Sequence, residues 1–218
     1  RLPRKFCAVA AAEGMLYVIG GADFALLPEE LKCMRRKPER FDPATNQWSM
    51  LPDMTATYTH VGAAAAGGFV YACGGFDSYE TSGHKRALAQ ACRLPCTSSA
   101  TWAWEPLESM PTARFECTAV CTMGQLHVLG GALVSGEALP HVESYDPSRK
   151  KWVKQPPMRF ARYGCSAVAM RGRIYVIGGL EGIGGFAEES ECFDPRTQEW
   201  TTIPAMLRSR PRCGAAAA

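Results

Sequence analysis

The chain has 218 residues, of which 47% are hydrophobic and 21% are charged, and its formal net charge is +3. This mixture is typical of a globular protein, so it excludes a disordered chain and gives no basic surface that would indicate nucleic acid or membrane as a partner. No apolar run reaches the roughly 20 residues of a transmembrane helix. The ten cysteines are interpreted as free, mostly buried thiols in a reducing compartment. This predicts a cytoplasmic protein, with a nuclear or cytoskeletal location as alternatives.

One pattern occurs four times along the chain. In each copy a short apolar run ends in two glycines, and a tryptophan at a matching position follows before the next copy begins. The glycines are Gly20, Gly21, Gly74, Gly75, Gly130, Gly131, Gly178 and Gly179. The tryptophans are Trp48, Trp104, Trp152 and Trp200. Several markers that keep one register define a tandem repeat, and the period of about 50 residues sets the architecture.

Each copy predicts short strands and no helix. Apolar, partly β-branched segments such as 165–170 and 174–177 are bounded by Gly, Asp and Pro, and nothing shows a sustained 3.6-residue period. The pairs Glu13-Gly14, Met123-Gly124 and Arg171-Gly172 predict tight hairpin turns. Asp-Pro turns are predicted later in three copies, at 42–43, 146–147 and 194–195, while the second copy has Arg93-Leu94-Pro95 there.

A period near 50 with a double glycine and a trailing tryptophan resembles the kelch repeat, over essentially the whole chain. The resemblance implies an all-β protein, a kelch-type β-propeller in which each repeat forms one four-stranded antiparallel blade. The repeats are predicted at about 1–54, 55–110, 111–158 and 159–206, with the first strand of a fifth in 207–218. Kelch propellers commonly have six blades, so the resemblance also implies that the chain is part of a larger propeller. The tryptophans are expected to fill the gaps between neighbouring blades.

The segments that differ between copies are the candidates for function, because the shared positions hold the fold. The connection between the second and third strands is basic in the first copy and acidic in the fourth. The basic residues are Lys32, Arg35, Arg36 and Lys37, and the acidic ones are Glu181, Glu188, Glu189 and Glu191. In kelch propellers these connections lie on one rim of the disc, so they predict a protein-binding rim. The alternative is that they are solvated loops whose charges keep the surface soluble.

A second candidate surface is formed by the repeated arginine, 16 residues before each glycine pair, and by its neighbours. One hypothesis places these arginines at the mouth of the central channel, facing acidic peptides. The structural alternative is that they bind backbone carbonyls between blades. The candidate partner-binding residues in this region are Tyr58, His60, Arg114, Phe115, Arg162, Tyr163 and Arg210, with Tyr58 standing where the other copies have arginine.

No pattern nominates a catalytic, metal or cofactor site. The pairs Cys92/Cys96 and Cys117/Cys121 suggest zinc superficially, but Cys117 and Cys121 would lie about 13 Å apart along a strand. Cys33 and Cys92, assigned to exposed basic loops, are alternative redox sensors. The four histidines, His60, His84, His127 and His141, are scattered over different copies, whereas a copper site would need several to converge. We therefore expect no cofactor, no metal and no catalysis.

The function predicted is a non-catalytic protein–protein interaction module that binds a partner protein and belongs to a larger complex. The kelch resemblance implies one common role, as substrate-recruiting adaptor of a cullin-based ubiquitin ligase. It leaves two alternatives open. One is a structural or actin-associated scaffold subunit, and the other is a kelch-type enzyme such as a copper oxidase, with its active site in blades outside this chain.

Overall fold

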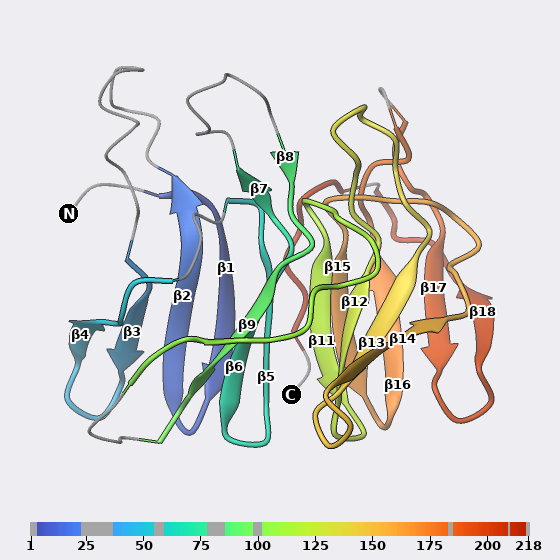
Figure 1. Cartoon of the computed structure of the whole chain (residues 1–218). Coiled ribbons are helices and arrows are strands. Elements are labelled where there is room, and N and C mark those ends of the chain that lie inside the picture. The colour runs from blue at the N-terminus through green and yellow to red at the C-terminus, as the bar shows by residue number, and fades with distance from the viewer. Residues whose placement is uncertain are drawn as a thin grey trace.

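The strands of the chain form a row of four separate antiparallel sheets. The computed structural model describes residues 4–22, 37–54, 59–77, 86–97, 102–182, 185–208 and 210–216. Within these ranges there are four four-stranded sheets, one two-stranded ribbon and no helix. Each large sheet comes from one repeat and is one blade, and Figure 1 shows the blades side by side in chain order. The prediction of an all-β propeller is confirmed.

The strands occupy the same places in every repeat. The first blade contains β1 (Lys5–Ala12), β2 (Met15–Ala22), β3 (Glu39–Asp42) and β4 (Gln47–Met50). The second contains β5 (Gly62–Ala66), β6 (Phe69–Cys73), β9 (Ala91–Pro95) and β10 (Glu105–Pro106), with β7 (Phe76–Asp77) and β8 (Arg86–Ala87) forming the ribbon. The third contains β11 (Thr118–Thr122), β12 (Gln125–Leu129), β13 (Val142–Asp146) and β14 (Lys151–Gln155). The fourth contains β15 (Ser166–Met170), β16 (Arg173–Ile177), β17 (Ser190–Asp194) and β18 (Glu199–Ile203).

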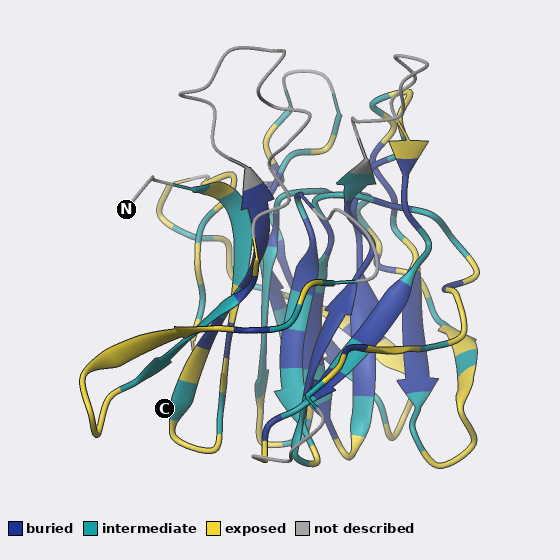
Figure 2. Ribbon diagram, turned by 60° about the vertical axis from the view of Figure 1, so that its left-hand side comes forward, coloured by how far each residue is buried: buried dark blue, intermediate teal, exposed yellow. Residues whose placement is uncertain are grey.

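The two ends of the blades differ. The innermost strands β1, β5, β11 and β15 lie next to one another, and the outermost strand of each blade is the most exposed. Since neighbouring strands are antiparallel, the turns after the first and third strands share one end, which we call the hairpin end. The connections from the second to the third strand lie at the other end, which we call the loop end. Figure 2 shows buried strands between exposed turns.

The predicted turns are confirmed at the hairpin end. In each of the three predicted hairpins two residues link the strands, and both have positive φ, as in Glu13 (49°) and Gly14 (73°). This is the type I′ geometry that suits twisted antiparallel strands. In the Asp-Pro turns the aspartate accepts backbone N–H groups. Asp42 Oδ1, for example, accepts the N–H of Ala44 at 2.8 Å, and this bond holds the pKa of the Asp42 carboxyl below its usual range.

Three of the glycine pairs join their blade to the next repeat. A Cβ on Gly74 would lie 2.7 Å from the backbone oxygen of Arg114, and Gly130 and Gly178 face the matching carbonyls of later blades as closely. The N–H of the second glycine donates to the same carbonyl, as from Gly75 to Arg114 O at 2.8 Å. The pair therefore consists of glycines because a side chain would separate the blades and break this hydrogen bond.

The arginines that open the third and fourth blades are structural. Arg162 Nη1 donates to the carbonyls of Gly178 (3.0 Å) and Glu189 (2.9 Å), and Nη2 donates to Glu191 Oε2 at 3.1 Å. Arg114 binds the carbonyls of Gly130 and His141 and pairs with Glu143 at 2.9 Å. Both arginine side chains are fully buried. Arg4 makes the same three kinds of contact, with Glu39 as its carboxylate.

Two expectations about buried residues were wrong. Glu191 is not part of a solvated acidic surface, because its side chain is 0% exposed and paired with Arg162. Cys92 does not lie in an exposed loop, since it is fully buried in β9. The strand pairing shows why. Cys92 faces Ala72 on the second strand, as Glu143 faces Val128, so it occupies the glutamate position of the second blade. That blade also has Tyr58 in place of arginine, although Tyr58 lies outside the described residues.

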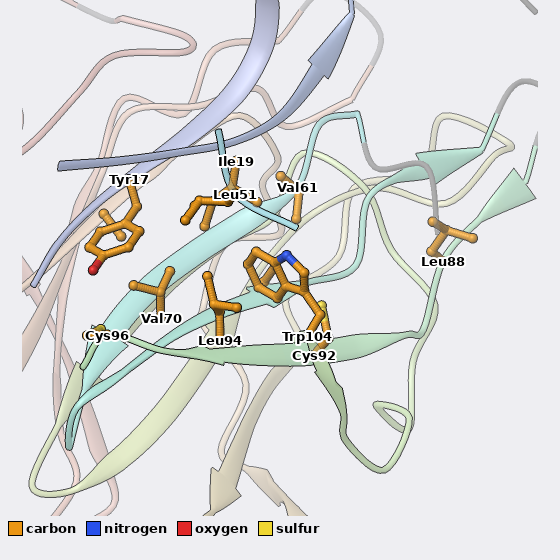
Figure 3. Packing of buried hydrophobic residues seen from close by; sticks show 12 residues of the cluster. Tyr17, Ile19, Leu51, Val61, Val70, Leu88, Cys92, Leu94, Cys96 and Trp104 are labelled. Carbon is orange, nitrogen blue, oxygen red and sulfur yellow. The ribbon is translucent and has the colours of Figure 1, made fainter. Parts of the chain in front are cut away.

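The core lies between blades, not within them. Figure 3 shows the seam between the first two blades, where Tyr17, Ile19 and Leu51 of the first face Val70, Leu94 and Trp104 of the second. The tryptophan indoles also bind across the seams. Trp104 donates Nε1–H to Pro52 O at 3.1 Å, Trp152 to Glu108 O at 2.7 Å and Trp200 to Pro156 O at 2.9 Å. The inter-blade role of these three tryptophans is confirmed, and Trp48 of the first blade is 38% exposed.

The fifth repeat begins in register but forms no described strand. The N–H of Arg212 donates to Gly164 O at 2.7 Å, and the N–H of Gly164 donates in the same way to Glu116 O. Arg212 therefore occupies the position in the fifth repeat that Gly164 occupies in the fourth. The first strand of a fifth repeat was expected within 207–218, and the described residues 210–216 have no strand assignment. A single segment without a second strand beside it has no ladder of hydrogen bonds to hold it as a strand.

We predict strong coupling between Arg162 and Glu191. Replacing either one alone, by Arg162→Tyr or Glu191→Cys, leaves a buried charge unpaired, and should lower the free energy of unfolding by about 3–5 kcal/mol. The double variant has the tyrosine and cysteine that the second blade has as Tyr58 and Cys92. Its loss in free energy of unfolding should be clearly smaller than the sum of the losses of the two single variants. Urea denaturation of the four proteins measures this. The exposed pair Lys37–Asp53, 3.7 Å apart, is the control and should show coupling of about 1 kcal/mol or less. Additive losses at Arg162 and Glu191 would contradict the prediction.

Candidate functional site

Five residues at one repeated position surround the axis of the propeller at the loop end. They are Phe6, His60, Glu116, Gly164 and Arg212, each two residues after the repeated arginine position, and we call them the hub. All five have φ between 51° and 59°. From His60 onward, the N–H of each hub residue donates to the carbonyl of the hub residue before it in the chain, at distances of 2.7 to 2.9 Å. This chain of hydrogen bonds holds four side chains in a left-handed backbone conformation that L-residues rarely adopt.

The hub lines a cavity of about 270 Å³. The residues that follow each hub position form the rest of its wall, namely Cys7, Val61, Cys117, Cys165 and Cys213. The innermost strand of each blade starts at the loop end (Figure 1), and the hub residues directly precede these strands, so the cavity lies at the loop end. A concave site with a few convergent polar groups is the usual form of a binding site.

The hub side chains contact one another in sequence. The rings of Phe6 and His60 are stacked with centroids 3.9 Å apart, and His60 Nε2 lies 3.6 Å from Glu116 Oε1. Arg212 binds Glu116 with two hydrogen bonds, from Nη2 at 2.7 Å and from Nε at 3.1 Å. Gly164 leaves room for this pair, since a Cβ there would lie 3.1 Å from Glu116 Oε2. The hub thus presents an aromatic platform beside a fixed ion pair.

The charges of the hub are balanced. Burial lowers the pKa of His60, the Glu116 carboxylate opposes this shift, and the Arg212 guanidinium adds to it. His60 is therefore neutral near pH 7. The Glu116 side chain is only 8% exposed, whereas that of Arg212 is 53% exposed. A molecule entering from the loop end therefore meets the guanidinium before the carboxylate.

Of the residues that the sequence nominated for binding, one lies in the hub. His60 is part of it, and Phe115 packs beside it with ring centroids 6.0 Å apart. Phe115 and Tyr163 form single β-bridges to Ala132 and Leu180. The remaining described candidates lie elsewhere. Arg114 and Arg162 are inside the blades, Arg210 is exposed, and Lys37 is exposed beside Asp53. Lys32, Arg35, Arg36 and Tyr58 lie outside the described residues.

Sequence analysis missed the other four hub residues. Phe6, Glu116, Gly164 and Arg212 share a position in the repeat but no residue type, and only Gly164 hints at a positive φ. The signal was present in the register. Two of the nominated residues, Phe115 and Tyr163, lie one position after the arginine and form bridges to the strand end, whereas the side chains two positions after it line the cavity.

The described residues bring no metal-binding group together. Within the described ranges no three His, Cys, Asp or Glu side chains converge as metal ligands. Cys92 and Cys96 pack in the seam of the first two blades, and Cys117 and Cys121 pack in the next one. His60 is in the hub, His127 is buried in β12, and His84 lies outside the described residues. The described part of the chain also has no helix long and apolar enough to span a membrane.

Comparison with known proteins identifies the repeat. The family model of the KLHDC2/KLHL20/DRC7 Kelch-repeats domain matches residues 5–218. The F-box/kelch-repeat protein At1g16250 of Arabidopsis thaliana is 36% identical over 125 residues, which are 56% of this chain and 31% of that protein. Human Kelch-like protein 33 is 32% identical over 114 residues, 51% of this chain and 20% of that one. Beta-scruin of Limulus polyphemus is 27% identical over 164 residues, 72% and 17% respectively.

A solved structure agrees with the fold. "Structure of YjhT" matches with a TM-score of 0.79 over 96% of this chain and 68% of that one. Its sequence identity is 15%, so it is evidence for the fold alone. This chain spans less than a third of the length of the three curated relatives named above.

We predict that His127 makes stability depend on pH. Burial lowers its pKa to about 4, partly opposed by the backbone of Gln125. In the unfolded chain the pKa of His127 is near 6.5, so the unfolded chain binds a proton first as the pH falls. The free energy of unfolding is therefore highest with respect to His127 above about pH 6.5, and it decreases as the pH falls toward 4. The loss should be about 2.5 kcal/mol between about pH 7 and pH 4.5. Urea denaturation of wild type and His127→Tyr at both pH values isolates it. An equal pH dependence of the two would contradict the prediction.

Proposed function

The chain belongs to the kelch-repeat family, and we propose that it is a non-catalytic module that captures a segment of a partner protein at the hub. The observation that carries the proposal is the contrast between fixed backbone and varied side chains. Four blades and the start of a fifth repeat place the same backbone position around one cavity, and equivalent hydrogen bonds link these positions. Four of these positions carry unlike groups, namely a phenyl ring, an imidazole, a carboxylate and a guanidinium, and the fifth is a glycine without a side chain. Function is expected where a repeated scaffold carries unlike groups.

The chemistry of the hub favours an acidic segment. Glu116 engages Nε and Nη2 of Arg212, and no described hydrogen bond uses Nη1. The guanidinium is thus fixed in direction, half exposed, and has a donor edge left for a carboxylate. The stacked rings of Phe6 and His60 give an apolar surface for the flanking part of the segment. Because the guanidinium is already ordered, binding loses little side-chain entropy.

The finer role that we propose is recruitment of a substrate to a cullin-based ubiquitin ligase. Its support is the kelch family itself and the similarity to an F-box/kelch-repeat protein and to a Kelch-like protein. In this role the hub supplies recognition, and the coupling to the ligase lies outside this propeller. The competing role is that of a structural, actin-associated subunit. In that role the bound protein would not be degraded.

The hub prediction concerns Arg212. In fluorescence titrations of the purified chain against acidic peptides, each paired with its Asp→Asn and Glu→Gln counterpart, the acidic members should bind and their affinity should fall as salt rises. Arg212→Ala should weaken binding at least tenfold, a loss of about 1.4 kcal/mol or more. Lys154→Ala, which removes an exposed lysine on β14, should leave binding unchanged. Equal affinity for the amide counterparts, or no effect of Arg212→Ala, would refute the hub as the site.

The ligase role has its own test in cells. The steady-state level of a protein captured through the hub should be lower with the wild-type protein than with Arg212→Ala, because recruitment leads to degradation. Blocking cullin activation should equalise the two levels. A captured protein whose level never changes, together with co-sedimentation of the protein with actin filaments, would favour the structural role and reject the ligase role.

A further inference from the structure

A second cavity, of about 360 Å³, lies between the third and fourth blades at the hairpin end. Its floor contains His127 of β12 and Ser144 of β13, and its wall contains Gln155 and Gln198. Met123 and Val153 line it as well and are 57% and 49% exposed. The cavity, which we call the seam cleft, is at the opposite end of the blades from the hub. It therefore shares no residue with the proposed recognition surface.

The seam cleft exists because two positions hold smaller side chains here than in the preceding blades. Strand pairing places His127 beside Ser144, where the first blade has Tyr17 beside Arg40 and the second has Tyr71 beside Arg93. Arg40 lies over the ring of Trp102 at 4.1 Å, and Arg93 lies over that of Phe69 at 4.0 Å. A tyrosine and an arginine thus occupy the equivalent space in the first two seams. Histidine and serine leave it open.

The floor of the seam cleft carries a buried polar atom without a partner. His127 is 1% exposed, and its Nδ1 makes no hydrogen bond. The side chains of the wall form a chain of hydrogen bonds that ends on Ser144. Gln198 Nε2 donates to Gln155 Oε1 at 2.8 Å, and Gln155 Nε2 donates to Ser144 Oγ at 2.8 Å. Described hydrogen bonds leave the Ser144 hydroxyl proton and Gln198 Oε1 unused. The cleft thus offers both donors and acceptors, and buried polar groups of this kind normally have partners.

The seam cleft is electrically neutral. Burial keeps His127 uncharged, since it lowers the pKa to about 4. The two ionised groups at its edge, Asp146 and Arg149, lie 3.7 Å from each other, and Asp146 Oδ1 also accepts from Ser148. At the buried floor, formed by His127 and Ser144, a charged group would meet no counter-charge, so its desolvation would not be offset. A neutral group that both donates and accepts is the chemistry that fits, and a carboxamide is such a group.

We propose that the seam cleft binds the carboxamide of a glutamine or asparagine side chain in a partner polypeptide, with His127, Ser144 and Gln198 as its hydrogen-bonding partners. The exposed apolar side chains of Met123 and Val153 favour a polypeptide over a free small amide, because they offer contact area to the residues on either side of the carboxamide. The protein would then have two independent recognition sites, one at each end of the blades.

Nuclear magnetic resonance titration of the purified chain tests the proposal. The probes are the blocked tripeptide acetyl-Ala-Gln-Leu-N-methylamide, its glutamate and norleucine counterparts, and propionamide. The glutamine peptide should give saturable shifts of the His127 ring and of the side-chain amides of Gln155 and Gln198. The two counterparts should bind at least tenfold more weakly, and propionamide more weakly than the glutamine peptide. No saturable shift, or equal binding of norleucine, overturns the proposal. Equal binding of propionamide overturns the polypeptide as its source.

Two variants separate binding from folding. His127→Tyr restores the tyrosine of the other three blades, so it should fill the cleft, keep the melting temperature and abolish the shifts at Gln155 and Gln198. Should that variant not fold, Ser144→Ala removes one hydroxyl and should weaken the glutamine peptide several-fold. The matched control is Thr45→Ala, which removes an exposed hydroxyl from the first blade and should leave this titration unchanged. Wild-type affinity in the folded His127→Tyr or Ser144→Ala variant overturns the assignment.

Discussion

The buried arginine at the start of a blade is the interaction on which the architecture depends. Arg162 fastens the second and third strands of its own blade through the carbonyls of Gly178 and Glu189, and its own carbonyl accepts the N–H of Gly131 from the blade before. One residue thus ties strands within a blade and blades to each other. Its charge is tolerable in the interior only because Glu191 neutralises it. The second blade has neither arginine nor glutamate, as this requirement demands, since losing one alone would leave a buried charge unpaired.

The fold was predictable because its signals are local and repeat in one register. A glycine pair, an Asp-Pro turn and a tryptophan can each be recognised within a few residues of sequence, so their periodic return predicted four blades and the correct order of strands. The glutamate partners were harder to predict because a connection of variable length separates them from the arginine. Glu39 follows Arg4 by 35 residues, while Glu143 and Glu191 each follow their arginine by 29. The equal spacing in the last two copies was the available signal.

The hub was predictable only in part, because it is defined by backbone position and not by residue type. His60 stood out as a histidine, but Phe6 and Glu116 carry no mark of the positive φ that the structure gives them. That conformation is imposed by hydrogen bonds between blades, which are contacts over 48 to 56 residues of sequence. Charge drew the sequence analysis to Arg114 and Arg162, and these proved to be fully buried. A charged residue that recurs at one position of most copies is therefore better explained by the scaffold than by recognition.

The two proposed sites lie at positions where the side chains depart from the repeat, and the scaffold lies at positions where they recur. Repeated side chains such as Arg162 and Trp200 donate their N–H groups to acceptors inside the protein. Positions that depart from the repeat leave groups unused, such as Nδ1 of His127 or one edge of Arg212. The hub needs every blade in register, because its backbone bonds run through all of them, whereas the seam cleft needs only two neighbouring blades. Evolution could therefore alter the seam cleft without disturbing the hub, and a propeller can gain a second recognition site by reducing two side chains in one seam.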